Sequence, residues 1–353
     1  MTGTADTSQL VERVAAMMAS YPDPVVERVV FGTADPKVIV AQIDAWCQRH
    51  LADRIISSWL WAVSVGCVAG VTLGDGRSVV VKAHQPDRTE ARLRGVMAVQ
   101  ERARVRGVPA PRPLAGPVSL GQGLATAEEA RAIGRRPDLL RDPDRATAAA
   151  GWSRLAAAVA DLTTLLADAS GPAASVVGGL YPRPHSPLFD FDATSHGAAW
   201  IDDLARAART ITDELRAPAV IVHTDWRGDN LRVDDAGTEL VAVFDWESVR
   251  VEPEAVALGQ VAAMHSIDWS GPADPYFASG GECVAFARCV ERARAAPFAA
   301  DEWAAVQAAI VYGWSYTARC EHARAIVGDD KRTFRMRERL AADGASLLAL
   351  ARG

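Results

Sequence analysis

Two short segments hold the side chains whose types and spacing are best suited to chemistry. Residues 222–230 read VHTDWRGDN and residues 243–247 read VFDWE, so Asn230 and Asp245 stand fifteen positions apart. Phosphoryl transfer requires a base near the acceptor hydroxyl and oxygen ligands for Mg²⁺, with little covalent help from the protein. Asp225 could be the base, while Asn230 and Asp245 offer the amide and carboxylate oxygens that Mg²⁺ binds.

The elements around these segments would bring the side chains together. Residues 219–222 and 240–244 are short apolar stretches typical of strands, and residues 234–237 read as a turn. A loop that leaves the first strand can direct Asp225 toward an acceptor while Asn230 turns back toward a metal ion. The alternative is an ordinary hairpin with polar turn residues. Asn230 is the only asparagine in the chain, which favours a chemical role for it.

The two segments resemble the signature of the aminoglycoside phosphotransferase and choline kinase superfamily, the small-molecule relatives of protein kinases. That signature is His-x-Asp-x-x-x-x-Asn, then an apolar strand ending in Asp, often within Asp-Trp-Glu. The resemblance covers roughly residues 55–350. It implies Asp225 as catalytic base and His223 as the residue that orients its loop, with Asn230 and Asp245 as magnesium ligands. One departure is that residues 254–258 read EAVAL, without the Asp-Leu-Ala common at that place.

Lys82 ends an apolar strand and is one of only three lysines among 38 basic residues. The resemblance implies that it holds the α- and β-phosphates of the nucleotide. A glutamate on the following helix would pair with it, and Glu90 and Glu101 are the candidates, with Glu90 preferred because it is near the helix start. The alternative for Lys82 is a strand-end lysine whose ammonium group lies in solvent.

Three further residues are assigned to the nucleotide or the reaction by position. Arg227 stands two residues after Asp225, where protein kinases carry a lysine that touches the γ-phosphate; a solvent-facing loop arginine is the alternative. Residues 64–70, SVGCVAG, occupy the place of the phosphate-covering loop, and Ser64 and Gly66 are its predicted nucleotide contacts because of that position. The segment departs from the usual pattern, since it lacks Gly-x-Gly-x-x-Gly.

Polar residues outside these motifs could line an acceptor pocket. They lie in the irregular segment 181–192 and on a late helix, and are His185, Asp190, Asp192, Glu321 and His322. A capped turn with buried aromatic residues is the plainer interpretation of the irregular segment.

Composition restricts the partners. The formal net charge is −6, which speaks against nucleic acid, whose phosphates require a basic surface. Residues 135–353 carry 23 basic and 31 acidic side chains, a balance that favours a cationic acceptor. No apolar run approaches the roughly 20 residues that span a bilayer, and no secretory signal is visible, so we expect a cytoplasmic protein without a membrane partner. The five cysteines lack metal-site spacing and are expected to be reduced thiols.

The predicted fold class is α+β, a bilobal protein-kinase-like fold with a small antiparallel sheet and a larger, mainly helical lobe. Residues 1–54 read as an N-terminal helical extension, and residues 55–118 as the small lobe, with strands followed by a helix. Residues 119–134 lie in a stretch rich in Pro and Gly and read as a hinge, and residues 135–353 form the helical lobe. The resemblance implies that ATP and Mg²⁺ lie in the cleft between the lobes.

The function implied is ATP- and Mg²⁺-dependent transfer of a phosphoryl group to a hydroxyl of a small molecule. An aminoglycoside-type antibiotic or an amino sugar is the expected acceptor, and a choline-like or homoserine-like alcohol is the alternative. The rival from another class is a catalytically silent, kinase-like nucleotide-binding protein, which the degenerate glycine loop favours. A metal-dependent hydrolase is a more distant third, because such enzymes usually gather more histidines.

Overall fold

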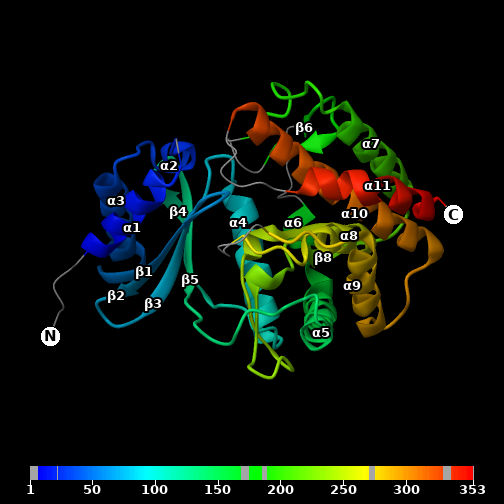
Figure 1. The fold of residues 1–353 in the computed structure, drawn as a ribbon. Helices are drawn as coiled ribbons and strands as arrows, with labels where there is room; N and C mark the ends of the chain where they lie inside the picture. The colour runs from blue at the N-terminus through cyan, green and yellow to red at the C-terminus, as the bar shows by residue number, and fades with distance from the viewer. Residues whose placement is uncertain are drawn as a thin grey trace. The chain divides into compact units, whose positions relative to one another are not determined.

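The computed structural model of the chain describes residues 7–21, 23–167, 175–184, 189–269, 275–328 and 335–352. These residues form two compact units (Figure 1). The first contains the described residues up to 101 together with residues 111–132. The second contains residues 102–110 and the described residues from 133 onward.

The first unit is built on a five-stranded antiparallel sheet with the order β1-β2-β3-β5-β4. Its strands are β1 (Ile55–Val63), β2 (Cys67–Leu73), β3 (Ser78–Ala83), β4 (Pro113–Leu120) and β5 (Gly123–Glu129). Helix α4 (Glu90–Val105) follows β3, as predicted. The turn between β2 and β3 contains Gly74 and Gly76, and Gly76 takes the left-handed φ of 87° that its turn position requires.

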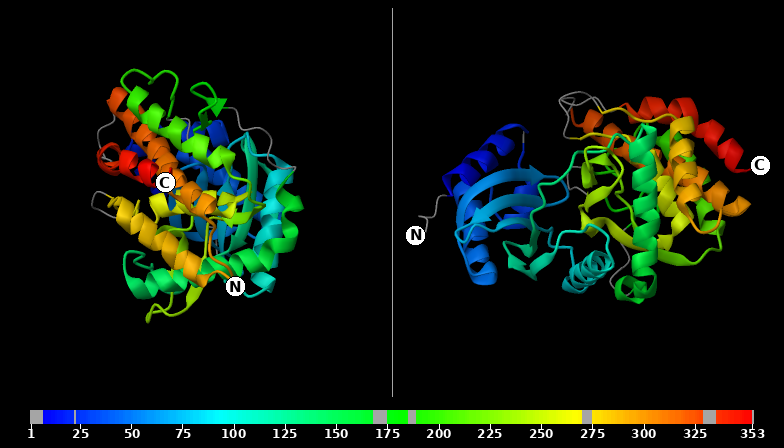
Figure 2. Two further views of the ribbon diagram at one scale, coloured as in Figure 1. Left: turned by 90° about the vertical axis from the view of Figure 1, so that its right-hand side faces the viewer. Right: turned by 90° about the horizontal axis from the view of Figure 1, so that it is seen from below.

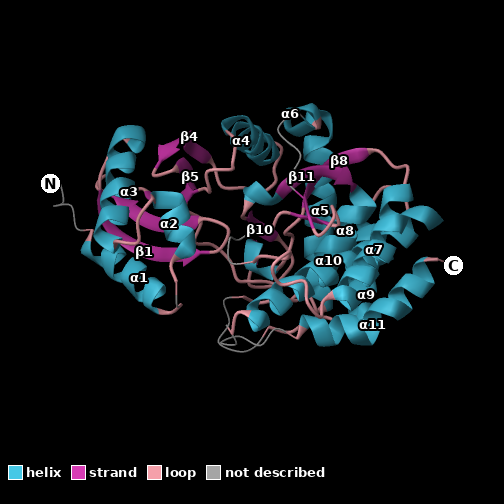
Figure 3. Ribbon diagram, turned by 90° about the horizontal axis from the view of Figure 1, so that it is seen from above, coloured by secondary structure: helices cyan, strands magenta, loops and turns pink. Residues whose placement is uncertain are grey.

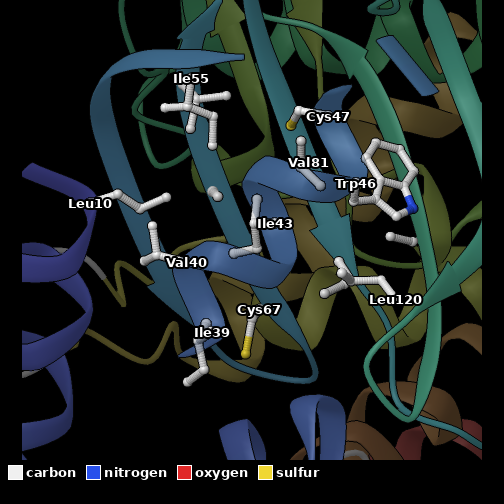
Figure 4. Packing of buried hydrophobic residues seen from close by; sticks show 14 of the residues in the cluster. Leu10, Ile39, Val40, Ile43, Trp46, Cys47, Ile55, Cys67, Val81 and Leu120 are labelled. Carbon is white, nitrogen blue, oxygen red and sulfur yellow. The ribbon is translucent and has the colours of Figure 1, made fainter. Parts of the chain in front are cut away.

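Three helices cover one face of this sheet: α1 (Ser8–Ala19), α2 (Val25–Phe31) and α3 (Pro36–Leu51). Asp35 caps α3, because its side chain accepts a hydrogen bond from the Lys37 N–H, and Pro36 stands at the first helical position. Apolar residues of α3 such as Ile43 and Trp46 share one core cluster with Val81 and Cys67 of the sheet (Figure 4). Residues 1–54, predicted as an extension, therefore contribute to the core of the first unit.

Strands occupy most of the segment predicted as a hinge. β5 lies inside the sheet, paired with both β3 and β4, and it ends only at Glu129. Its sequence, GLATAEE, is poor in the β-branched and aromatic residues that favour strands. Pairing on both sides and burial of Ala125 and Ala127 in the core compensate for that weak preference.

The second unit is mainly helical (Figures 2 and 3). Its helices are α5 (Asp142–Val159), α6 (Thr164–Ala167), α7 (Ala199–Glu214), α8 (Glu254–Met264), α9 (Gly280–Ala293), α10 (Ala300–Ile326) and α11 (Met336–Ala351). The long α10 packs against α7, α8 and α11. Two-stranded sheets complete the unit: β6 (Ser175–Val176) with β7 (Tyr181–Pro182), β8 (Ala219–His223) with β11 (Val249–Pro253), and β9 (Leu231–Val233) with β10 (Leu240–Val243).

These elements confirm the predicted fold class, a small antiparallel sheet with helices followed by a larger, mainly helical part. All five cysteines are buried and free, as expected of reduced thiols. Within the described ranges, no helix has the length and apolar character needed to cross a membrane.

Candidate active site

Two neighbouring strand pairs of the second unit place the predicted motifs at the ends of their strands. Residue 223 of β8 pairs with residue 249 of β11, and residue 231 of β9 pairs with residue 243 of β10. The loops that carry Asp225 and Asp245 therefore leave adjacent strand ends. Trp226 and Trp246, which follow the two aspartates, are fully buried and anchor the loops in the core.

His223 joins the two loops directly. Its Nε2 lies 2.8 Å from the carbonyl oxygen of Phe244, and its Nδ1 lies 3.3 Å from the backbone nitrogen of Asp225. Because a carbonyl oxygen only accepts, the proton resides on Nε2, and Nδ1 accepts from the Asp225 N–H. The fully buried ring meets Trp226 and Trp246 edge-on at 5.7 and 6.0 Å. This geometry suits the orienting role predicted for His223.

Asn230 is fixed by Asp225. Its Nδ2 donates to the backbone oxygen of Asp225 at 2.9 Å and to Asp225 Oδ2 at 2.7 Å. The amide nitrogen is thus used within the loop, and no described residue donates a hydrogen bond to the amide oxygen Oδ1. That oxygen remains as a potential ligand for a hard cation.

A backbone hydrogen bond holds Asp245 close to Asn230: the N–H of Phe244, which precedes Asp245, donates to the Asn230 carbonyl oxygen at 2.8 Å. It adopts a left-handed conformation with φ 60° and ψ 50°, which aspartate tolerates better than most residues. The Ser248 hydroxyl donates to Asp245 Oδ2 at 3.1 Å. An amide oxygen and a carboxylate are oxygen donors of the kind that Mg²⁺ prefers, so the residues present fit the predicted ion.

Arg227 is an internal part of the loop, with only 16% of its side chain exposed, so it is not the solvent-facing arginine of the alternative. Its Nε lies 2.6 Å from Asp225 Oδ1 and its Nη2 lies 3.1 Å from Asp225 Oδ2. Burial disfavours the charged guanidinium, but Asp225, Asp229 and Asp245 outweigh that effect and raise the pKa of Arg227. In this conformation both oxygens of the predicted base are engaged.

The ion pairs continue beyond Arg227 in a chain of alternating charge. Arg227 Nη1 lies 2.9 Å from Asp229 Oδ2, and Asp229 Oδ1 lies 3.2 Å from Arg136 Nη2. Arg136 also pairs with Asp268. Arg136 was not predicted from the sequence, because it is far from the loop along the chain. In the structure the two segments pack closely: a Cβ on Gly228 would lie 2.9 Å from the carbonyl oxygen of Pro137, the residue after Arg136.

In the first unit Lys82 is 8% exposed, and its Nζ lies 3.2 Å from Glu128 Oε1. Gln100 of α4 donates to the other oxygen of Glu128 at 2.9 Å. The predicted pairing with Glu90 is not found: the Glu90 side chain is 56% exposed and lies 2.5 Å from Arg94, one helical turn along. The reason is the register of the sheet, which sets Lys82 opposite Thr126 and so brings Glu128, two residues along β5, within reach.

The predicted phosphate-covering loop is a tight turn between β1 and β2. The Ser64 N–H donates to the Gly66 carbonyl oxygen at 3.0 Å, and the Ser64 side chain is exposed. Gly66 approaches β3 so closely that a Cβ would lie 2.4 Å from the Ala83 oxygen. The glycine therefore has a packing reason independent of any nucleotide, and the nucleotide role of both residues stays a prediction.

The residues predicted for an acceptor pocket mostly have hydrogen-bond partners within the second unit. Asp190 accepts from the Ala193 N–H, as expected of a capped turn, and Asp192 accepts from the Val177 N–H. Glu321 accepts from the Arg337 N–H at 2.8 Å, and burial raises its pKa. His322 donates to the His196 carbonyl oxygen at 2.8 Å, and burial lowers its pKa. His185 lies outside the described residues.

Comparison with known proteins gives a family and a set of similar folds. The model of the phosphotransferase enzyme family matches residues 70–298. No curated protein matches the sequence. An amicoumacin kinase solved with AMP-PNP, Ca²⁺ and Ami has a TM-score of 0.55 at 13% identity, covering 83% of this chain and 88% of that chain.

Two further solved structures show the same fold. The microcompartment-associated aminopropanol kinase has a TM-score of 0.57 at 13% identity, covering 89% of this chain and 96% of that chain. An ethanolamine kinase from Plasmodium vivax has a TM-score of 0.51 at 11% identity, with 99% and 95% covered. At such low identity the similarity concerns the fold.

Proposed function

The chain belongs to the phosphotransferase enzyme family, and we propose that it transfers the γ-phosphoryl group of ATP to a hydroxyl of a small molecule with the help of Mg²⁺. The observation that supports this most strongly is the grouping of Asp225, Asn230 and Asp245 on two loops that His223 connects by hydrogen bonds. Each of these side chains has a partner that fixes its position. The arrangement supplies a base and two oxygen ligands, which are the groups that phosphoryl transfer needs.

In the proposed reaction Asp225 takes the proton of the acceptor hydroxyl. The acceptor oxygen forms a bond to the γ-phosphorus as the bond from that phosphorus to the β–γ bridging oxygen breaks, which yields a phosphate ester and ADP. The acceptor hydroxyl can approach Asp225 through the second lone pair of Oδ1 or by displacing Arg227 from that oxygen. A guanidinium released from Asp225 could then bind phosphate oxygens, which is the role predicted for Arg227 by position.

Asn230 Oδ1 and the Asp245 carboxylate would hold Mg²⁺, which when bound offsets the charge of the phosphate oxygens. In the first unit, Lys82 would bind nucleotide phosphates, with Glu128 and Gln100 keeping the ammonium group in place. A buried ammonium group is suited to an anionic ligand, because burial strengthens its attraction to phosphate.

We propose an aminoglycoside-type antibiotic or an amino sugar as the acceptor. The acidic balance of residues 135–353 supports a cationic molecule. Proteins of similar fold include kinases of amicoumacin, aminopropanol and ethanolamine, which are compatible with this chemistry. A small amino alcohol remains the alternative acceptor.

One observation favours the rival function, nucleotide binding without transfer. Arg227 and Asn230 together bind both carboxylate oxygens of Asp225, so the base is not free in this conformation. A silent protein would bind Mg-ATP and never consume it, with or without an acceptor.

The decisive experiment measures ATP consumption over a panel of amino sugars, aminoglycosides and amino alcohols. Each acceptor is compared with a no-acceptor control and with the Asp225→Asn protein. Acceptor-dependent ADP formation that the variant lacks is the expected result. Mg-ATP binding with no turnover on any acceptor would leave the silent function, and no Mg-ATP binding at all would refute both.

A further inference from the structure

Asp229, the residue before Asn230, is a half-buried carboxylate with three partners among the described residues. Its Oδ2 accepts from Arg227 Nη1 at 2.9 Å and from the Trp269 N–H at 3.3 Å, and its Oδ1 lies 3.2 Å from Arg136 Nη2. Only 16% of the Asp229 side chain is exposed. Its negative charge is therefore shared between two guanidinium groups, one from its own loop and one from a distant segment of the chain.

Arg227 is itself shared between two carboxylates. Its Nε and Nη2 contact the two oxygens of Asp225 at 2.6 and 3.1 Å, while its Nη1 contacts Asp229. A guanidinium group that is attracted by two carboxylates binds each of them less tightly than it would bind either one alone. How tightly Arg227 holds the predicted base therefore depends on the charge of Asp229.

Arg136 moderates Asp229 from the other side. It packs directly on the loop, because a Cβ on Gly228 would lie 3.0 Å from Arg136 Nε. From Arg136 through Asp229 and Arg227 to Asp225, the charges alternate in sign. Removing Asp229 would strengthen the attraction between Arg227 and Asp225. Removing Arg136 would strengthen the attraction of Asp229 for Arg227 and so weaken the pair of Arg227 with Asp225.

We propose that Asp229 and Arg136 are positioning residues that act through Arg227 and set how tightly it holds the base Asp225. They thereby control how readily this carboxylate takes the proton of the acceptor hydroxyl. The inference rests on the proposed function, which makes Asp225 the base. It requires that loss of Asp229 and loss of Arg136 change the pair of Arg227 with Asp225 in opposite directions. Residues that only supported the loop would show no such difference in sign.

The first measurement is turnover on the acceptor that gives the highest rate in the panel. Asp229→Asn keeps the shape of the side chain and removes its charge, so kcat should fall roughly tenfold, the value of one charge-assisted hydrogen bond. The thermal shift caused by Mg-ATP should persist in this variant. In Arg136→Met, kcat should not fall below the wild-type value.

Arg136→Met is expected to fold. Arg136 and Gly228 line a cavity of about 290 Å³, so the shorter side chain enlarges an existing space and leaves the packed core intact. The double variant Asp229→Asn/Arg136→Met should have the kcat of Asp229→Asn, because Arg136 reaches Arg227 only through the Asp229 carboxylate.

The second measurement follows the Arg227 Nε–H resonance by NMR and needs no turnover. This N–H donates to Asp225 Oδ1, so its resonance reports the strength of the pair. It should move downfield in Asp229→Asn and upfield in Arg136→Met. Arg135→Met is the matched control, because the neighbouring Arg135 pairs with Asp144 through both Nη atoms. It should lower the melting temperature and leave kcat and the Arg227 resonance unchanged.

The inference is overturned if Arg136→Met lowers kcat as much as Asp229→Asn does, or if Asp229→Asn keeps the wild-type kcat. It is equally overturned if the Arg227 resonance stays in place, or moves in the same direction in both variants. A wild-type protein that consumes no ATP with any acceptor would count against the proposed function. The Arg227 resonance would still decide whether Asp229 and Arg136 control the pair of Arg227 with Asp225.

Discussion

The Nε2–H of His223 donates to the carbonyl oxygen of Phe244, the residue that precedes Asp245. One buried imidazole therefore connects the loop of the predicted base to the loop of the predicted metal ligand. Its other nitrogen accepts from the Asp225 N–H, so both aspartates are positioned by backbone contacts of the same ring. The distance between base and metal site depends on this residue.

Replacing His223 with Phe should lower activity and stability together. The Phe244 carbonyl and the Asp225 N–H both lose a partner, which costs on the order of 1–3 kcal/mol for each buried group left unsatisfied. We expect a lower urea midpoint and a fall in kcat/KM of more than tenfold. His50→Phe is the control, since the His50 ring also packs beside a tryptophan but lies in the other unit. Wild-type kcat/KM in His223→Phe would contradict the orienting role.

Asp225→Asn and Asp245→Asn should fail in different ways. Loss of the base should reduce kcat by roughly 10²- to 10⁴-fold while Mg-ATP still raises the melting temperature. Loss of the metal ligand should remove that thermal shift. Asp213→Asn, an exposed change on α7, should affect neither measurement. If Asp225→Asn turned over normally, or Asp245→Asn kept the full thermal shift, the corresponding assignment would be wrong.

Glu128→Gln should weaken nucleotide binding where Glu90→Gln does not. Glu128 holds Lys82 at 3.2 Å, and removing its charge loosens the ammonium group and reduces the Mg-ATP affinity by about tenfold. Glu90 is exposed and pairs with Arg94, so its replacement should be neutral. The readout is the dissociation constant of AMP-PNP for each protein. Equal constants for both variants and the wild type would refute the role of Glu128.

The stability of the protein should decrease as the pH falls from about 6.5 toward 4. Burial holds the pKa of His265 at about 4, with Arg145 lowering it further and Glu282 and Asp138 opposing. In this pH range the unfolded chain binds a proton that the folded chain does not, so unfolding is favoured as the pH falls. The full effect of this one group is about 3 kcal/mol. Urea melts should show a shallower pH dependence in His265→Phe, and an unchanged slope would contradict the assignment.

The motif residues could be predicted from the sequence because their spacing is local. His223, Asp225 and Asn230 lie within one loop, and the strand that ends at Val243 determines where Asp245 can be. Helix α3 was equally readable, because Asp35 and Pro36 mark its start through backbone chemistry that neighbours in sequence provide. Local rules suffice wherever the interacting groups are close in the chain.

Partners that meet through tertiary structure could not be predicted in this way. Glu128 reaches Lys82 only because β5 pairs with β3, and β5 itself has a composition that does not favour strands. The cavity beside Gly228 joins residues 136–139 to residues 265–268, which share no sequence pattern. Such contacts depend on register and packing, which single-sequence patterns do not encode.

The packing of α1, α2 and α3 on the sheet has a consequence for anyone who trims this protein. The family match begins only at residue 70, which invites a shorter fragment. Such a fragment would lose β1 and the three helices, and would expose Val71, Val79 and Val81 to water on one sheet face. An exposed apolar face with an unpaired edge strand promotes aggregation. By burying that face, the N-terminal helices should keep the first unit from aggregating.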